Sequence, residues 1–170
     1  MSKKEKANRS KFGMAQYWLK PILDFVRQGF KGYSPTVEGF VAAKSWLLKN
    51  AFEGTGATLS INPALVKVSH GELPLSGNIT AEKNGTDELL FSWDTEPVEG
   101  GSPYDQVMML AYDPKHEVAY SNITGQFRNT GSDTLKIHKT PGRTYHLYLA
   151  FTAADRTSQS DSVYLGTMTS

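Results

Sequence analysis

Turn dipeptides punctuate the second half of the chain at short intervals, and this rhythm constrains the fold more than any other feature. Asn84-Gly85, Gly100-Gly101 and Thr130-Gly131 separate short segments in which apolar and polar residues alternate. In Leu89 to Trp93 every second side chain is Leu, Phe or Trp. Because neighbouring residues of a strand point to opposite faces, this segment has a strongly apolar face. Short strands at this spacing predict an antiparallel β-sandwich or barrel.

Two further segments identify the centre of the predicted sheets. Val107 to Tyr112 is apolar on both faces, as expected of a central strand. Tyr145 to Thr152 alternates one bulky apolar row with a second row that includes Tyr148 and Ala150. We therefore predict a structural core that contains Trp93, Tyr145, Leu147 and Leu149.

The region from Asn78 to Met168 resembles a fibronectin type III domain. In that family a strand ends on a core Trp, as Leu89 to Trp93 does here, and a Pro-Gly-x-x-Tyr element precedes the sixth strand, as Pro141 to Tyr145 does. The resemblance implies a tyrosine corner, in which the hydroxyl of this tyrosine bonds to upstream backbone. The chain has Lys139 where the family has an apolar residue, so we expect Ile137 to anchor the corner instead.

The first fifty residues carry a helical pattern. From Lys11 to Lys31, apolar residues recur at spacings of three and four, which is the stripe of an amphipathic helix. Pro21 lacks an N–H and clashes with the preceding turn, so we predict a kink or break near Lys20. A second helix is predicted to start at Ser34-Pro35, with the serine as N-cap, and to close between Asn50 and Gly56.

These patterns assign the chain to the α+β class, with an N-terminal helical hairpin followed by an antiparallel β-sandwich of the fibronectin type III or immunoglobulin type. The predicted parts are a basic amphipathic helical hairpin over 1–56, a connecting strand segment over 57–77 and the sandwich over 78–170. Ala57 to Leu73 has the alternation of a strand, and Pro63 and Pro74 place it at an edge or a connection.

Charge is divided unevenly along the chain. Residues 1–50 contain 10 Lys and Arg against 3 Asp and Glu, a net charge of +7, whereas residues 51–170 contain 8 against 14, a net charge of −6. Three interpretations stay open. The basic segment is solvated or docks on its own acidic body, it binds an acidic protein surface, or it binds nucleic acid.

The aromatic side of the helical hairpin needs a covering surface, because two short helices make a thin core. That surface is either the chain's own sandwich or a partner, which would be another copy or another protein. We favour a non-catalytic assembly or interaction module, in which the hairpin grips the partner and the sandwich projects, as in cell-surface, mobile-element and phage-virion assemblies. The candidate partner-binding residues are Phe12, Trp18, Leu19, Phe25, Phe30, Phe40 and Trp46.

Two other binding functions stay open. Carbohydrate or cell-surface binding by the sandwich would use exposed aromatic side chains, for which Tyr104, Tyr112 and Tyr148 are candidates. Nucleic-acid binding would use the basic N-terminal segment and would weaken steeply with salt. Its candidate residues are Lys3, Lys4, Lys6, Arg9, Lys11, Lys20 and Arg27.

Residue patterns that announce catalysis are missing from the sequence. The chain has no cysteine, which excludes thiol catalysis, cysteine-ligated zinc and disulfides. His70, His116, His138 and His146 stand singly, without the spacing of a metal-binding motif. A nucleophile elbow, a phosphate-binding loop and a dinucleotide fingerprint are also missing. We expect a protein that is not an enzyme and that holds no cofactor or metal.

Landmarks in both parts of the chain are similar to those of a Bacteroidota family of unknown function (domain of unknown function 6266). They include Asn8 to Phe12, Leu19 to Pro21, Phe91 to Trp93 and Tyr148 to Phe151, in that order. This resemblance implies no activity, cofactor or catalytic residue. Members usually begin with an additional basic segment rich in Gly and Val, so we expect a truncated or alternative start here.

The first thirteen residues lack the apolar run of a signal peptide, and no membrane span is predicted. The bacterial cytoplasm and an assembled particle or surface both stay open as compartments, as does a leader that is removed.

Overall fold

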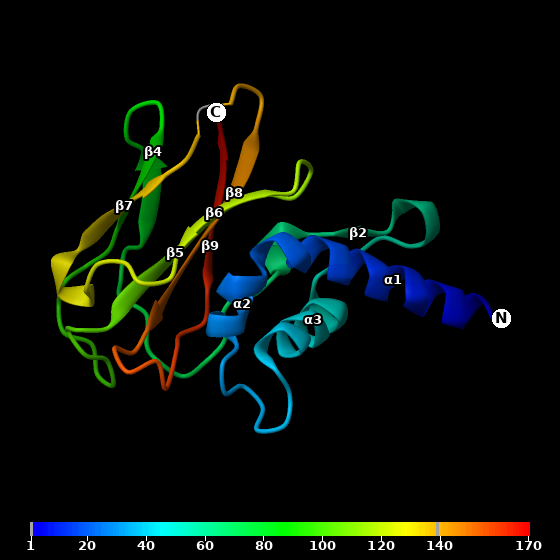
Figure 1. The fold of residues 1–170 in the computed structure, drawn as a ribbon, viewed down its shortest axis with the longest axis horizontal. Coiled ribbons are helices and arrows are strands. Elements are labelled where there is room, and N and C mark those ends of the chain that lie inside the picture. The colour runs from blue at the N-terminus through cyan, green and yellow to red at the C-terminus, as the bar shows by residue number, and fades with distance from the viewer. Residues whose placement is uncertain (1, 139) are drawn as a thin grey trace.

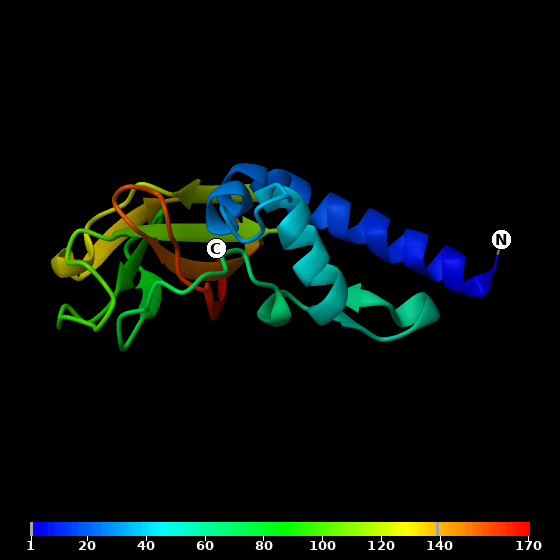
Figure 2. The same cartoon turned by 90° about the horizontal axis from the view of Figure 1, so that it is seen from below.

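The computed structural model describes residues 2–138 and 140–170, apart from the side chains of residues 4 and 6–9. Helices cover one face of a four-stranded antiparallel sheet, and a three-stranded antiparallel sheet lies over its other face. Figures 1 and 2 show this arrangement, with the N-terminal helix at one end of the longest axis. The mixture of N-terminal helices and antiparallel sheets confirms the α+β class.

The helical segment is interrupted where the sequence predicts it. A 3-10 turn with Pro21 in its first positions separates two α-helices, which confirms the predicted break near Lys20. The third helix packs against both of them. The elements are α1 (Lys3–Leu19), η1 (Lys20–Ile22), α2 (Leu23–Gly29) and α3 (Gly39–Asn50).

The predicted start of the second helix at Ser34-Pro35 was wrong, because α3 begins at Gly39 with Glu38 as its N-cap. The Ser34 hydroxyl accepts a hydrogen bond from the Thr36 N–H at 3.4 Å, so it closes a local turn and does not cap a helix.

Nine strands form three antiparallel sheets within the described residues. A two-stranded ribbon pairs β1 with β2, the three-stranded sheet has the order β3-β4-β7, and the four-stranded sheet has the order β6-β5-β8-β9. The strands are β1 (Phe52–Glu53), β2 (Ser60–Ile61), β3 (Thr80–Lys83), β4 (Glu88–Ser92), β5 (Gln106–Asp113), β6 (Val118–Asn122), β7 (Ser132–Lys136), β8 (Thr144–Thr152) and β9 (Val163–Thr169).

The connector from residue 57 to 77 is mostly irregular, so the predicted strand from Ala57 to Leu73 was wrong. Only β2 and isolated bridges near its end have strand pairing. Asn62 and Pro63 open a 3-10 turn, in which the Asn62 side chain accepts a bond from the Ala64 N–H at 3.0 Å. Further along, the Val68 N–H donates to the Ser162 hydroxyl at 3.0 Å. Bonds of this kind replace a strand ladder.

One apolar cluster fills the space between the three-stranded and four-stranded sheets. The four predicted core residues Trp93, Tyr145, Leu147 and Leu149 all lie in it. Trp93 contacts Phe151 edge to face, with ring centroids 5.5 Å apart. Its indole N–H donates to the backbone carbonyl of residue 128 at 2.7 Å, so this buried polar atom is satisfied.

A buried ion pair closes one end of this cluster. The side chains of Arg128 and Asp105 are each 3% exposed, and Nη2 of the arginine lies 2.9 Å from a carboxylate oxygen. The other guanidinium N–H groups donate to the Ser76 hydroxyl and the Pro74 carbonyl. Such a pair persists in the interior because Nε, Nη1 and Nη2 of the guanidinium are all bonded, and removing one partner would leave an uncompensated charge.

The hydrogen bond that defines the predicted tyrosine corner is not made within the described residues, so this prediction was wrong. Tyr145 is fully buried, but its hydroxyl has no hydrogen-bond partner among the described residues. Lys139, which stands at the family's apolar position, lies outside the described residues. Ile137 is buried in the same cluster as Tyr145, where it contributes apolar packing.

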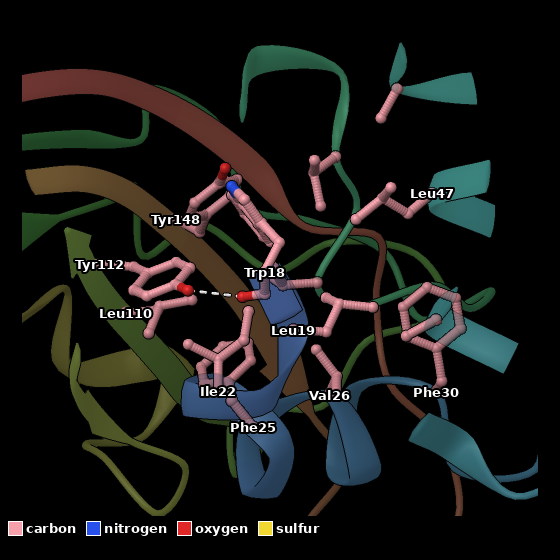
Figure 3. Close-up of a cluster of buried hydrophobic side chains, with 14 of the residues drawn as sticks. Trp18, Leu19, Ile22, Phe25, Val26, Phe30, Leu47, Leu110, Tyr112 and Tyr148 are labelled. Atoms are coloured by element: carbon pink, nitrogen blue, oxygen red, sulfur yellow. Dashed lines mark hydrogen bonds between the residues drawn. The ribbon is translucent and has the colours of Figure 1, made fainter. Parts of the chain in front are cut away.

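A second apolar cluster lies on the opposite face of the four-stranded sheet, under the helices. Met108, Leu110 and Tyr112 of β5 and Tyr148 and Ala150 of β8 belong to it, whereas the residues between them face the first cluster. The central strands are therefore buried on both faces, as Val107 to Tyr112 was predicted to be. Figure 3 shows the helical side chains that pack onto this face.

Two buried phenols tie the helices and the connector to the sheet. The Tyr112 hydroxyl donates to the Trp18 carbonyl in the last turn of α1 (Figure 3), and the Tyr148 hydroxyl donates to the Pro63 carbonyl at 2.6 Å. Burial raises the pKa of both phenols above the ordinary tyrosine value, because the charged form would lose its hydration.

The variant Tyr112→Phe tests the bond between helix and sheet. It keeps the ring but leaves the buried Trp18 carbonyl without its phenol donor, so we expect a loss of about 1–2 kcal/mol in the free energy of unfolding. Urea denaturation followed by far-UV circular dichroism measures this loss. Tyr104→Phe, at a ring that is 60% exposed, is the matched control and should leave the unfolding midpoint unchanged. Equal midpoints for both variants would contradict the assigned bond.

Candidate functional site

The N-terminal half of α1 projects from the molecule. Its first turns extend beyond α3 and beyond the β1–β2 ribbon in both views (Figures 1 and 2). The helix begins at Lys3 because a capping box holds its first turn. Ser2 Oγ accepts from the Glu5 N–H at 3.1 Å, and the Glu5 carboxylate accepts from the Ser2 N–H at 3.0 Å. The Ser-x-x-Glu spacing was the signal for this start, which the apolar stripe from Lys11 did not reveal.

The candidate partner-binding residues are divided between core and surface. Trp18, Leu19, Phe25 and Phe30 are buried in the cluster between helices and sheet, because the stripe that they form faces β5 and β8 (Figure 3). These four side chains are covered by the chain itself, which corrects the prediction that they form an accessible surface. Phe40 and Trp46 are half-buried, and Phe12 is 51% exposed.

An exposed apolar strip remains where α1 crosses α3. Lys44 stands at its centre, with Nζ 4.5 Å from the Phe12 ring centroid, 5.1 Å from the Phe40 ring centroid and 2.7 Å from Gln16 Oε1. Val41, one turn before Lys44 on α3, is 45% exposed. We call Phe12, Phe40, Val41 and Lys44 the arm patch. It is the part of the aromatic stripe that the sheet leaves uncovered.

The candidate nucleic-acid residues do not form one continuous surface. Lys3 is exposed on the projecting end of α1, which also carries Lys4, Lys6 and Arg9, whose side chains lie outside the described residues. Lys11 places Nζ 5.7 Å from the Phe52 ring centroid. Farther along, Lys20 is exposed in η1, and Arg27 pairs with Glu38 at 2.9 Å. The basic residues are therefore divided between the projecting end and the other end of the helical segment.

The end of the molecule opposite the arm is acidic and exposes two aromatic rings. The loop between β4 and β5, residues 94–105, contains four Asp and Glu and no Lys, Arg or His. Tyr104 and Phe127 are 60% and 42% exposed, and their rings meet edge to face with centroids 5.9 Å apart. We call residues 94–104 with Phe127 the acidic end. In Figure 1 this loop and the N-terminus lie at opposite ends of the longest axis.

The aromatic row proposed for carbohydrate binding does not form. Tyr112 and Tyr148 are fully buried under the helices, and of the three candidates only Tyr104 is exposed. That prediction is corrected because the helical segment covers the face of the sheet from which the other two project. Phe127, which the sequence did not single out, is the ring beside Tyr104.

A cleft of about 550 Å³ lies where three chain segments meet: residues 31–33, 70–72 and 157–161. Gln159 joins them, because its Nε2 donates to the carbonyls of Lys31 and His70, both at 2.9 Å. Its Oε1 is buried without a partner among the described residues. A Cβ at Gly71 would lie 2.0 Å from the Gln159 carbonyl oxygen, so this close approach requires glycine.

Asp161 organises one wall of the cleft. Its carboxylate lies 2.6 Å from His70 Nδ1 and 3.0 Å from Lys67 Nζ. The His70 ring stacks on Trp46 at 5.2 Å, and Lys67 Nζ lies 4.6 Å from the Trp46 ring centroid. Burial alone would raise the pKa of Asp161, but hydrogen bonds from Lys67 and the Gly71 N–H, with the charges of Lys67 and His70, outweigh it and lower the pKa. The contacts tie α3 and the connector to the β8–β9 loop.

The other histidines lie in separate surroundings. His116 Nδ1 is 2.6 Å from the buried carboxylate of Asp113 at the β5–β6 turn, and His138 packs on Tyr120. His146 Nδ1 is 2.8 Å from the Tyr164 hydroxyl, and burial lowers the pKa of this histidine. Across residues 2–138 and 140–170 no group of three or more His, Asp or Glu is arranged to hold a metal ion.

The fold places the chain in the class of mixed helix-and-sheet proteins, with N-terminal helices followed by antiparallel sheets. Residues 3–166 match the family of unknown function DUF6266, and the chain belongs to that family. No curated protein and no solved structure matches the chain. Within the part of the chain that the structure describes, no helix has both the length and the apolarity to cross a bilayer.

The variant Asp161→Asn tests how the cleft is held. A carboxyl group whose pKa is lowered by folding stabilises the native state above its unfolded pKa of about 4, and this contribution is lost as the pH falls through the lower folded value. We therefore expect the wild-type urea midpoint to fall below about pH 4 more steeply than that of Asp161→Asn. The variant should be less stable at neutral pH, because Lys67 and His70 lose their partner.

Urea midpoints between about pH 3 and pH 7 provide the measurement. Glu72→Gln, which removes an exposed carboxylate from the same cleft, is the matched control for the loss of one charge. Parallel pH curves for wild type and Asp161→Asn would contradict the role assigned to Asp161.

Proposed function

We propose that this protein is a non-catalytic interaction module, in which the projecting end of α1 and the arm patch dock on a partner protein. The observation that carries this proposal is the division of one aromatic stripe into two parts. Trp18, Leu19, Phe25 and Phe30 are covered by the sheet, whereas Phe12, from the same stripe, is exposed. Val41 of α3 adds a second exposed apolar side chain. Large apolar side chains that gather on an exposed surface are typical of an interaction site.

The body that carries the arm is a β-sandwich of the fibronectin type III kind in this proposal. The strand orders β3-β4-β7 and β6-β5-β8-β9 support it, because seven-stranded sandwiches of the immunoglobulin type likewise divide their strands three and four between two antiparallel sheets. The buried Trp93 and Tyr145 in the cluster between the sheets support it further. The Bacteroidota origin of the chain is a proposal that rests on the sequence resemblance alone.

The charged groups of the body support a non-catalytic role. Asp161 is bonded to Lys67 and His70, Asp113 to His116 and Asp105 to Arg128. A general base or nucleophile must be held within bonding distance of a reacting group. Asp161 and Asp105 are instead occupied in joining segments of the fold, and Asp113 is occupied within the β5–β6 turn, which is the behaviour of structural ion pairs.

Site-specific cross-linking at Phe12 tests the proposed function. We expect that Phe12→p-benzoylphenylalanine, irradiated in the cells that naturally produce the protein, gives one discrete covalent adduct with a protein, because the ring lies within the docking surface. Mass spectrometry identifies the linked peptide.

The same photo-reactive residue at Thr86, an exposed position in the β3–β4 turn, is the control and should give no matching adduct. A second probe carries the photo-reactive residue at Val41. The proposal fails if neither the Phe12 probe nor the Val41 probe gives an intermolecular product.

Nucleic-acid binding is a second candidate function, favoured by the sequence of the projecting helix. Residues 3–11 contain five Lys and Arg against one Glu. If these five contact phosphates, fluorescence anisotropy with a random DNA duplex should show a slope of about −4.5 in log affinity against log salt concentration. Arg9→Glu should weaken binding and make the slope shallower. Absence of binding at low salt removes this candidate and leaves the protein-docking proposal standing.

A further inference from the structure

We infer that the partner of the arm is a second copy of this chain, which receives the arm at its acidic end. This inference rests on the proposed function and names its partner. Two surfaces of the same molecule carry it, the projecting end of α1 with the arm patch and the acidic end defined above. They match in charge and in apolar character, and they lie at opposite ends of the molecule.

The charges of the two surfaces are opposite. The projecting helix carries a net charge of +4 over residues 3–11, and residues 94–105 carry four carboxylates without a basic residue. Asp105 is paired internally with Arg128, which leaves Asp94, Glu96 and Glu99 as the exposed carboxylates of the loop. Opposite potentials of this kind steer two surfaces together and suppress wrong partners.

The apolar groups of the two surfaces are also complementary. The arm patch offers Phe12 and Val41, and the acidic end offers the exposed ring pair of Tyr104 and Phe127. Aromatic pairs gain from edge contacts beyond their area, and a lysine or arginine over an exposed ring gains a cation–π contact. The β4–β5 loop also contains a small crevice of about 80 Å³, lined in part by Pro97 and Pro103. In this contact the aromatic rings of the acidic end, which lie among carboxylates, therefore meet the apolar side chains of the arm, which lie among basic residues.

The geometry makes the contact intermolecular. The N-terminus and the β4–β5 loop lie at opposite ends of the longest axis in both views (Figures 1 and 2), so one molecule's arm does not reach its own acidic end. The C-terminal part of α1 is locked into the core through Trp18 and Leu19, which holds the arm in this direction. Two different surfaces in contact make a heterologous interface, which builds chains or rings of copies.

Sedimentation velocity over a wide range of protein concentration measures the association. We expect wild-type protein at low salt to form head-to-tail oligomers whose population rises with concentration and falls as salt is added, because both surfaces are exposed and charge pairs between them are screened. The arm variant combines Lys3→Glu with Lys4→Glu. Acidic residues in a first helical turn favour the helix, so this variant keeps the arm folded. The end variant combines Glu96→Lys with Glu99→Lys.

Each variant alone should weaken association about tenfold or more. Mixing the two variants should restore one contact, in which the native arm of the end variant meets the native acidic end of the arm variant. The chain that carries all four substitutions has a net charge of zero over residues 3–11 and over residues 94–105, so it should associate as weakly as either variant alone. Lys83→Glu with Lys136→Glu, two exposed lysines of the three-stranded sheet, reverses the same amount of charge elsewhere and should leave association unchanged.

Photo-cross-linking separates this inference from the proposed function. In a mixture of light and heavy-isotope protein, Phe12→p-benzoylphenylalanine should link the light arm to heavy peptides from residues 94–105 or 127–129. A monomer at every concentration, or association unaffected by both reversals, overturns the inference. If the cells yield a Phe12 adduct with a different protein, the proposed function stands and the second copy is excluded. If no intermolecular adduct forms at all, both fall.

Discussion

The four-stranded sheet is buried on both faces, and the rest of the structure depends on this arrangement. Side chains of β5 and β8 alternate between two apolar clusters, one under the three-stranded sheet and one under the helices. A sheet with one solvent-exposed face would present polar residues on that face. Here Met108, Leu110 and Tyr148 project from the face under the helices, and such side chains must be buried by another part of the chain. The helical segment buries these side chains. The helices and the four-stranded sheet therefore share one of the two apolar clusters and fold as a unit.

This arrangement explains why the strands could be predicted from the sequence and the position of the helices could not. Alternation in Leu89 to Trp93 and double-sided apolarity in Val107 to Tyr112 are local signals, which fix strands and their buried faces. The stripe around Trp18 and Phe25 indicates only that one helical face is buried. Whether it meets its own sheet or a partner depends on long-range contacts such as the bond from Tyr112 to the Trp18 carbonyl, which no local pattern contains.

The remaining differences have local physical causes. Ser34 and Pro35 form a dipeptide that is typical of a helix start. However, the serine oxygen accepts a hydrogen bond within a local turn, and the helix begins only at Gly39. The connector has the alternation of a strand, yet its Val68 N–H bonds to a serine side chain of another segment. The cleft around Gln159 joins residues separated by more than a hundred positions along the chain. Such a site arises from tertiary contacts, and no local pattern around Gln159 indicates it. Likewise, Phe127 becomes part of a surface only when the fold brings it beside Tyr104.

The two halves of α1 have different surroundings, and their union in one helix has a consequence for binding. The C-terminal half is fixed in the core by Trp18 and Leu19, and the N-terminal half begins with a capping box at Ser2 and Glu5. A continuous helix transmits the direction of its fixed end to its projecting end, since rotation about individual residues would break the backbone bonds between turns. An arm built in this way loses less conformational entropy on docking than a flexible basic tail of the same charge. Its orientation relative to the acidic end is therefore a property of the fold, which allows a small contact between copies to be specific in direction.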